Sequence, residues 1–142
     1  MSQTTIEIRT VADSSLAVGS SGPRTLTIDR SKEADGLSLG FNGGELLLLA
    51  IGGCYSNDIF REAAKRSIAV RNVQITVEAD WGGDPVRAQN VSFSVVVEAD
   101  AGEQEILDLI QHTDRVAEIP NSLRLGTDVK LDGMKAISGR PR

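Results

Sequence analysis

Polar and apolar positions alternate near the start of the chain and again in its second half. Residues 4–11, TTIEIRTV, predict an edge-type strand, and short strand-like runs on either side of a turn at Gly19–Pro23 predict a hairpin. Residues 71–80 and 87–100 alternate with period two around the turn WGGDPV, which contains two glycines and a proline. These two runs predict the clearest hairpin of the chain.

Apolar residues at helical spacing mark two other stretches, residues 45–65 and residues 102–118. A short turn at 119–123 and a final strand at 127–133 follow, and residues 134–142 are expected to form a flexible tail. Strands combined with two main helices predict an α+β fold, in which the helices pack on one face of a mainly antiparallel sheet. At this length we expect one domain over the whole chain, residues 1–142.

The first predicted helix has a clear start signal. Asn42 followed by Glu45 predicts a capping box, in which each side chain accepts a hydrogen bond from a backbone N–H at the helix start. Leu46–Ile51 are apolar on every side of the helix, and a domain this small rarely encloses a helix by itself. We therefore expect a second copy of the chain to cover this helix in a homodimer.

The only cysteine, Cys54, lies where the apolar half of this helix meets its polar half. Gly52 and Gly53 precede it, although each glycine costs about 1 kcal/mol relative to alanine inside a helix. Either another backbone element approaches closely there, or something requires room beside the thiol. A free cysteine most often packs as a small hydrophobic residue. A reactive thiolate needs a nearby cation, for which Arg61 is a candidate, although Asp58 opposes it.

Composition and charge argue against several classes of function. The formal net charge is -5 and the chain has no run of lysine and arginine, so we expect no nucleic-acid partner. His112, the only histidine, has no partner at metal-ligand spacing, so we expect it to be a surface or helix-C-terminal residue, and we expect neither a metal site nor a cofactor. The apolar run is far too short to cross a membrane. A single cysteine and the absence of a signal-peptide pattern predict a cytoplasmic protein.

The stretch ELLLLAIGGC, residues 45–54, resembles the first cysteine motif of the OsmC/Ohr family, and the order of predicted elements is similar to that family over nearly the whole chain. The resemblance implies an intertwined homodimer, with the cysteine helix buried between the subunits and two active sites at their interface. It also implies reduction of organic hydroperoxides, as in the best-studied branches. There the first cysteine becomes a sulfenic acid, and a second cysteine condenses with it to a disulfide.

The chain departs from that family pattern because it lacks the second cysteine. The family's second motif, typically Cys-Pro-Val-Ser-Asn-Thr-Leu, is best matched by AEIPNSL, which places Ala117 at the cysteine, or Ile119 if the prolines are aligned. The resemblance further implies an activating arginine from the N-terminal strands, for which Arg24 is the candidate, and a carboxylate at or beside Glu45. Glu45 is equally well explained as the capping residue, and Arg24 as an exposed strand residue.

Three hypotheses follow. The first is a thiol peroxidase with one cysteine, in which Cys54 attacks an organic hydroperoxide and an external thiol reductant resolves the product. Arg24 or Arg61 then favours the thiolate, and Glu45 orients that cation. The second is a non-catalytic OsmC-like protein that holds an apolar small molecule at the dimer interface. The third is a purely structural dimer, in which Cys54 can become alanine at little cost.

Overall fold

The computed structural model describes residues 1–139 and confirms the predicted α+β class. Two main helices are present, as predicted, together with a short third one. The elements follow in the order β1 (Glu7–Thr10), β2 (Ala17–Ser21), β3 (Arg24–Ile28), a 3-10 helix η1 (Lys32–Ala34), α1 (Gly43–Lys65), β4 (Ala69–Gly82), β5 (Arg87–Asp100), α2 (Glu103–Val116) and α3 (Glu118–Arg124).

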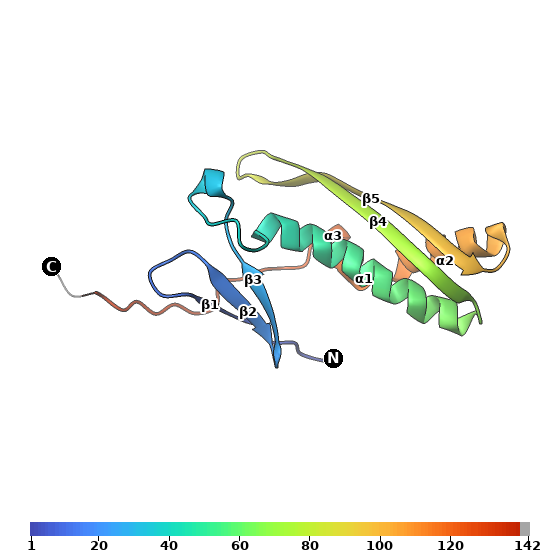
Figure 1. Ribbon diagram of the computed structural model, residues 1–142, viewed down its shortest axis with the longest axis horizontal. Helices are drawn as coiled ribbons and strands as arrows, with labels where there is room; N and C mark the ends of the chain where they lie inside the picture. The colour runs from blue at the N-terminus through green and yellow to red at the C-terminus, as the bar shows by residue number, and fades with distance from the viewer. Residues whose placement is uncertain (140–142) are drawn as a thin grey trace.

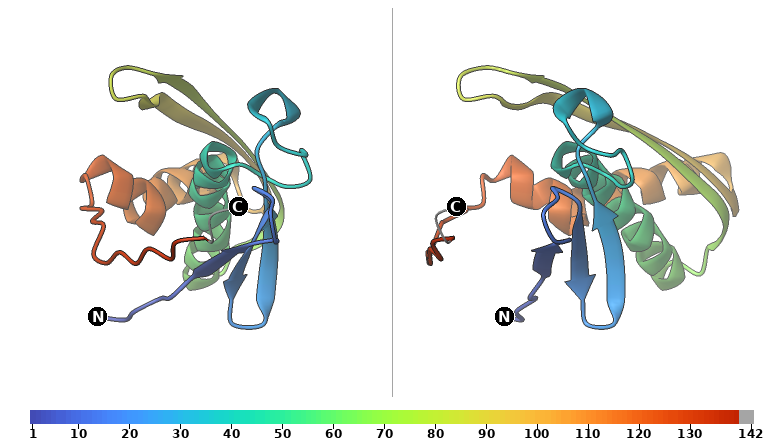
Figure 2. Two further views of the ribbon diagram at one scale, coloured as in Figure 1. Left: turned by 90° about the vertical axis from the view of Figure 1, so that its left-hand side faces the viewer. Right: turned by 60° about the vertical axis from the view of Figure 1, so that its left-hand side comes forward.

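The strands form two separate antiparallel sheets, whereas the sequence predicted one. The N-terminal sheet has the order β1-β2-β3, and the second sheet is the β4–β5 hairpin. Both hairpins were predicted at their correct places. No strand of the first sheet pairs with β4 or β5, and the 23 residues of α1 connect the two sheets. Figure 2 shows the N-terminal sheet on one side of α1 and the helices α2 and α3 on the other.

The first helix begins where the capping signal placed its start. The side chain of Asn42 accepts from the N–H of Glu45 at 2.8 Å, and a carboxylate oxygen of Glu45 accepts from the N–H of Asn42 at 3.0 Å. The predicted capping box is therefore confirmed. From Gly43 the helix runs to Lys65 beneath the β4–β5 hairpin (Figure 1).

The hydrophobic core lies between α1, α2 and the inner face of β4–β5. Its buried members are Tyr55, Ile59, Ala63, Leu109 and Ala117, and partly buried residues of both strands pack against them. The rings of Tyr55 and Phe93 lie 5.2 Å apart between centroids, and the Tyr55 hydroxyl donates to the carbonyl of Ile110 at 2.8 Å. Burial raises the pKa of that hydroxyl, and the charge of Asp114 adds to the effect.

The apolar first half of α1 is not enclosed by its own chain. Ile51 is buried, but Leu49 keeps 51% of its surface exposed. The N-terminal sheet likewise leaves Ile6, Ile8 and Leu26 exposed. Burial of these residues by a second copy stays a prediction, as does the homodimer.

The C-terminal third contains the main corrections to the predicted elements. The second helix ends at Val116, two residues earlier than predicted, and the expected turn at 119–123 belongs to α3. Pro120 explains the break, because it cannot donate to a carbonyl of α2 and its ring crowds the preceding turn, whereas the first turn of a new helix tolerates it.

The predicted strand at 127–133 is wrong for the single chain. Residues 127–139 form neither helix nor strand, and the side chains of Val129 and Leu131 are almost fully exposed. A strand requires a neighbour to complete its hydrogen bonds, and among residues 1–139 no strand pairs with this segment. Of the predicted tail, residues 134–139 have no regular structure, and residues 140–142 lie outside the described residues.

Candidate functional site around Cys54

Cys54 lies on α1 where this helix faces the start of α3. The backbone N–H of Ile119 donates to its sulfur, with 3.5 Å between Sγ and the nitrogen. Oδ2 of Asp58, one helical turn further along α1, lies 3.7 Å from Sγ and can accept the thiol proton. The residue is only partly buried. The sulfur therefore sits between one donor and one acceptor, with part of the residue open to solvent.

Asp58, the carboxylate beside the thiol, is buried, and the arginine that it pairs with also contacts two other carboxylates. Asp58 is 6% exposed, and Nη1 of Arg61 lies 3.0 Å from its Oδ1. The same guanidinium also reaches Glu62 at 3.1 Å and Glu118 at 3.7 Å. The hydrogen bond to Glu62, together with the nearby carboxylates, raises the pKa of Arg61. Within residues 1–139 no hydrogen bond joins this arginine to the sulfur, and Asp58 contacts both of them.

A second buried carboxylate, Glu62, ties α1 to α2. Its Oε1 lies 2.8 Å from Nε2 of His112, and its Oε2 lies 2.7 Å from Nζ of Lys65. These two hydrogen bonds lower the pKa of Glu62 to about 2, although burial works against them. Of the two predicted positions for His112, the structure agrees with the one near the C-terminal end of α2 and not with a free surface residue. The residue is half-buried and bridges two helices, because α2 packs directly on the polar half of α1.

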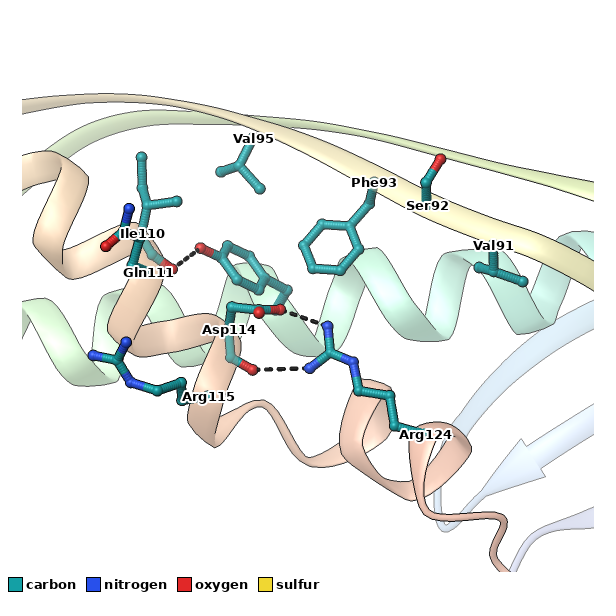
Figure 3. A pocket seen from close by; sticks show the side chains of 10 residues that line it. Val91, Ser92, Phe93, Val95, Ile110, Gln111, Asp114, Arg115 and Arg124 are labelled. Atoms are coloured by element: carbon teal, nitrogen blue, oxygen red, sulfur yellow. Dashed lines mark hydrogen bonds and ion pairs between the residues drawn. The ribbon is translucent and has the colours of Figure 1, made fainter.

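The short helix α3 is held in place from its far end. Arg124 lies 2.6 Å from Oδ1 of Asp114 and donates to the carbonyl of the same residue at 3.1 Å (Figure 3). Asn121 donates to the carbonyl of Arg115 at 2.9 Å. These bonds anchor α3 to the end of α2 and thereby fix the amide of Ile119 against the sulfur.

Two predicted site residues lie away from Cys54 within one chain. Glu45 precedes the cysteine by nine residues, which corresponds to about 13.5 Å along the helix and the opposite side of it. Arg24 donates to Ser21 at 3.4 Å at the tip of the β2–β3 hairpin, which projects away from α1 in Figure 1. One chain therefore does not bring these residues together, and their catalytic roles stay predictions.

The two glycines before the cysteine differ in their surroundings. A Cβ on Gly52 would lie 3.2 Å from a methyl group of Val77, so the absence of a side chain lets α1 approach β4 closely. A Cβ on Gly53 would meet nothing within 4 Å. Close approach of another element thus explains Gly52, and Gly53 leaves open space next to Cys54 in the chain.

Two cavities lie on the side of α1 that faces β5, α2 and α3. The smaller, about 350 Å³, is lined chiefly by Leu47, Ile51, Phe93, Pro120 and Leu123. It adjoins the site, since Ile51 is one turn before Cys54 and Pro120 follows Ile119. The larger, about 600 Å³, is shown in Figure 3 and has the Asp114–Arg124 pair on its wall.

The described part of the chain, residues 1–139, contains no cluster of three or more histidine, cysteine, aspartate or glutamate side chains placed to hold a metal ion. Of the helices in that same part, none combines the length and the apolar character that crossing a membrane requires.

Comparison with known proteins identifies the family. Residues 34–132 match the sequence profile of the family described as OsmC-like protein. The chain belongs to the OsmC-like family. No protein of curated function matches its sequence significantly.

Solved structures share the OsmC-like fold at low sequence identity. An OsmC like protein from Mycoplasma pneumoniae is 18% identical, with a TM-score of 0.76 over 89% of either chain. An organic hydroperoxide resistance protein OsmC from Legionella pneumophila is 17% identical, with a TM-score of 0.60 over 87% of this chain and 90% of the other. One from Elizabethkingia anophelis is 18% identical, with a TM-score of 0.58 over 89% and 91%.

The second family motif differs from the expected OsmC-like pattern at the residues that face Cys54. Ala117 is fully buried between α2 and α3, and Ile119 touches the sulfur through its backbone. Neither position carries a thiol, and Cys54 is the only cysteine of the chain. An internal disulfide is therefore impossible, whichever of the two positions corresponds to the second cysteine.

The sequence places Asp58 on the same face of the helix as Cys54, but only as a residue that opposes Arg61, and it assigns no role to Glu62, which lies one turn beyond the site. Their spacing is the signal that could have found them, because Cys54, Asp58 and Glu62 recur every four residues and so share one side of α1. That side runs beside the core residues Tyr55 and Ile59, and α2 and α3 cover it.

Proposed function

We propose that the protein reduces organic hydroperoxides, with Cys54 as its single peroxidatic thiol and an external thiol as reductant. The observation that carries the proposal is the partly exposed sulfur held between the N–H of Ile119 and the carboxylate of Asp58. Membership of the OsmC-like family supports it, and so does the fold shared with organic hydroperoxide resistance proteins.

In the first step the sulfur of Cys54 attacks the terminal oxygen of the hydroperoxide. An S–O bond forms, the O–O bond breaks, and the thiol proton ends on the departing alkoxide, so the products are a sulfenic acid and an alcohol. The N–H of Ile119 stabilises the negative charge that develops on sulfur during deprotonation.

The sulfenic acid then requires a thiol from outside the chain. One external thiol condenses with it, releasing water and leaving a mixed disulfide on Cys54. A second external thiol attacks that disulfide, which returns the free cysteine and an external disulfide.

The proposal includes a homodimer. The exposed apolar residues of the N-terminal sheet, of α1 and of residues 127–139 support it, since monomeric proteins rarely expose this much contiguous apolar surface. Arg24 and Glu45 can take part in the chemistry only if the dimer places these residues of one subunit next to Cys54 of the other.

The test is intact-mass analysis of the reduced protein after brief exposure to an organic hydroperoxide, beside Cys54→Ser. We expect one oxygen to be added at Cys54 much faster than to a free cysteine in solution, and an added thiol to reverse the addition. Oxidation no faster than that of free cysteine would refute the peroxidase.

A second candidate function is the binding of an apolar small molecule, which the lining of the smaller cavity favours. An apolar fluorescent dye should then bind to the native protein, and Leu123→Glu should weaken binding because it places a charge in the cavity wall. Cys54→Ser should leave dye binding unchanged, whereas it abolishes peroxide reduction.

A further inference from the structure

Asp58 is a buried carboxylate with an unusual pair of partners. Within the described residues the polar contacts of its side chain are with the Cys54 thiol, at 3.7 Å, and with the guanidinium of Arg61, at 3.0 Å. Burying a carboxylate costs several kcal/mol unless it is well paired, and Arg61 divides its charge among three carboxylates. An ion pair at this spacing forms equally well on the exposed face of a helix. Structural stability alone therefore does not explain why Asp58 faces the sulfur.

We propose that Asp58 is a catalytic residue that takes the proton from Cys54 and returns it to the departing alkoxide. This inference rests on the proposed peroxide reduction. In the step, the S–H proton moves to Oδ2 as the sulfur attacks the terminal peroxide oxygen. The S–O bond forms, the O–O bond breaks, and the protonated Asp58 protonates the alkoxide. Sulfenic acid, alcohol and an ionised Asp58 result, so no further acid or base is consumed.

The local charges favour a proton that stays within the pair. A thiolate beside an ionised Asp58 would place two negative charges 3.7 Å apart, whereas one shared proton leaves a single negative charge beside Arg61. From α3, Glu118 adds negative charge and the Ile119 N–H adds a donor to sulfur. From α2, His112 faces Glu62, one turn away from Asp58.

The position of Asp58 also suits the second proton transfer, from its carboxyl group to the departing alkoxide. The alkoxide forms one bond length beyond the oxygen that joins Sγ, and Oδ2 of Asp58 lies 3.7 Å from Sγ, so a hydroperoxide that approaches on the side of Asp58 releases its alkoxide within reach of Oδ2. An alkoxide is a poor leaving group unless it is protonated as it departs, and a positioned acid contributes about 10²–10⁴-fold to such steps.

The experiment compares two reagents on the wild-type protein and on Asp58→Asn. Organic hydroperoxide releases an alkoxide that needs a proton, whereas iodoacetamide releases iodide, which needs none. Asparagine keeps the shape of the side chain but cannot carry the proton. We expect the ratio of the peroxide rate to the alkylation rate at Cys54 to fall about 100-fold in Asp58→Asn. An unchanged ratio would overturn the role of Asp58.

The matched control is Glu62→Gln, which neutralises an equally buried carboxylate on the same side of α1 that also binds Arg61 but does not touch sulfur. Its ratio should equal that of the wild type. If the ratio of the peroxide rate to the alkylation rate falls equally in Asp58→Asn and in Glu62→Gln, the loss of any nearby negative charge explains the effect. That result would overturn the inference.

The peroxide rate of the wild-type protein distinguishes a failure of the proposed function from a failure of the role of Asp58. If its peroxide rate equals that of free cysteine, the peroxidase fails and the role of Asp58 fails with it. Should Asp58→Asn not fold, the wild type is measured in heavy water, where the peroxide reaction should slow more than the alkylation does. Equal slowing of the two reactions would contradict proton transfer in the peroxide step.

Discussion

The N-terminal sheet and the part of the chain from α1 to α3 both contain antiparallel strand pairs, but they differ in how far these strands are covered. The β4–β5 hairpin has strands of 14 residues, and α1 and α2 cover its inner face, so the part from α1 to α3 closes around a core of its own. The N-terminal sheet has three strands of four or five residues, and its apolar side chains Ile8 and Leu26 stay exposed although Leu46 of α1 lines the same hollow. Figure 1 shows this sheet projecting from the body of the chain.

The difference teaches which part of the molecule is complete by itself. The part from α1 to α3 contains both the core and the thiol with Asp58, so one chain positions Cys54. The N-terminal sheet and residues 127–139 carry apolar side chains that the described part of the chain leaves exposed. The proposed homodimer would cover these side chains with a second copy.

We expect the largest effect from a substitution that disrupts the proposed homodimer. We expect the wild-type protein to have twice the mass of one chain in sedimentation equilibrium. Ile8→Asp should give the mass of one chain, because a charge buried in an apolar interface costs several kcal/mol. Ser94→Asp, on the exposed face of β5, is the matched control and should keep the double mass. A wild type with the mass of one chain would refute the dimer.

The next effect tests the self-contained core. Ile59 is fully buried, so Ile59→Ala should lower the free energy of unfolding by about 2–5 kcal/mol. Val96, which is 65% exposed, serves as the control, and Val96→Ala should change it by less than about 0.5 kcal/mol. Urea unfolding measures both values. Similar costs at the two positions would contradict the assignment of the core.

A smaller effect depends on pH and sharpens the picture of the α1–α2 contact. The pKa of Glu62 is lowered from its usual 4.5 to about 2, so its stabilising contribution is complete above pH 4.5 and is lost as the pH falls towards 2. The difference in unfolding free energy between wild type and Glu62→Gln should therefore shrink as urea titrations move from about pH 6 to about pH 3. A difference that does not depend on pH would show that the charge of Glu62 is not what joins the helices.

The smallest effect concerns the start of α1. Asn42→Ala removes a capping acceptor and should cost about 0.5–2 kcal/mol. Glu45→Gln keeps a side chain that can serve in a capping box, so the unfolding free energy should hardly change. If Glu45→Gln nevertheless slows the reaction of Cys54 with peroxide, the carboxylate acts in catalysis beyond its capping role.

Local patterns were sufficient for the elements that local interactions determine. The capping pair Asn42 and Glu45 marked the start of α1. A glycine- and proline-containing turn marked the β2–β3 hairpin, and period-two alternation marked the β4–β5 hairpin. Each of these signals depends on residues close in sequence. The strand predicted at 127–133 failed for the opposite reason, since a strand exists only where a neighbour pairs with it. The motif ending at Cys54 identified the family correctly.

What the sequence by itself determined is the fold class, the family, the single thiol and the impossibility of an internal disulfide. The tertiary structure decided what surrounds that thiol. The contact of Ile119 with the sulfur and of His112 with Glu62 joins residues 65 and 50 positions apart. The four-residue spacing places Asp58 beside Cys54, and the packing of α2 and α3 decides that this side of α1 is buried. Helical spacing places residues on a common side of α1, but only the packing of the other helices determines which side is buried and which charges meet there.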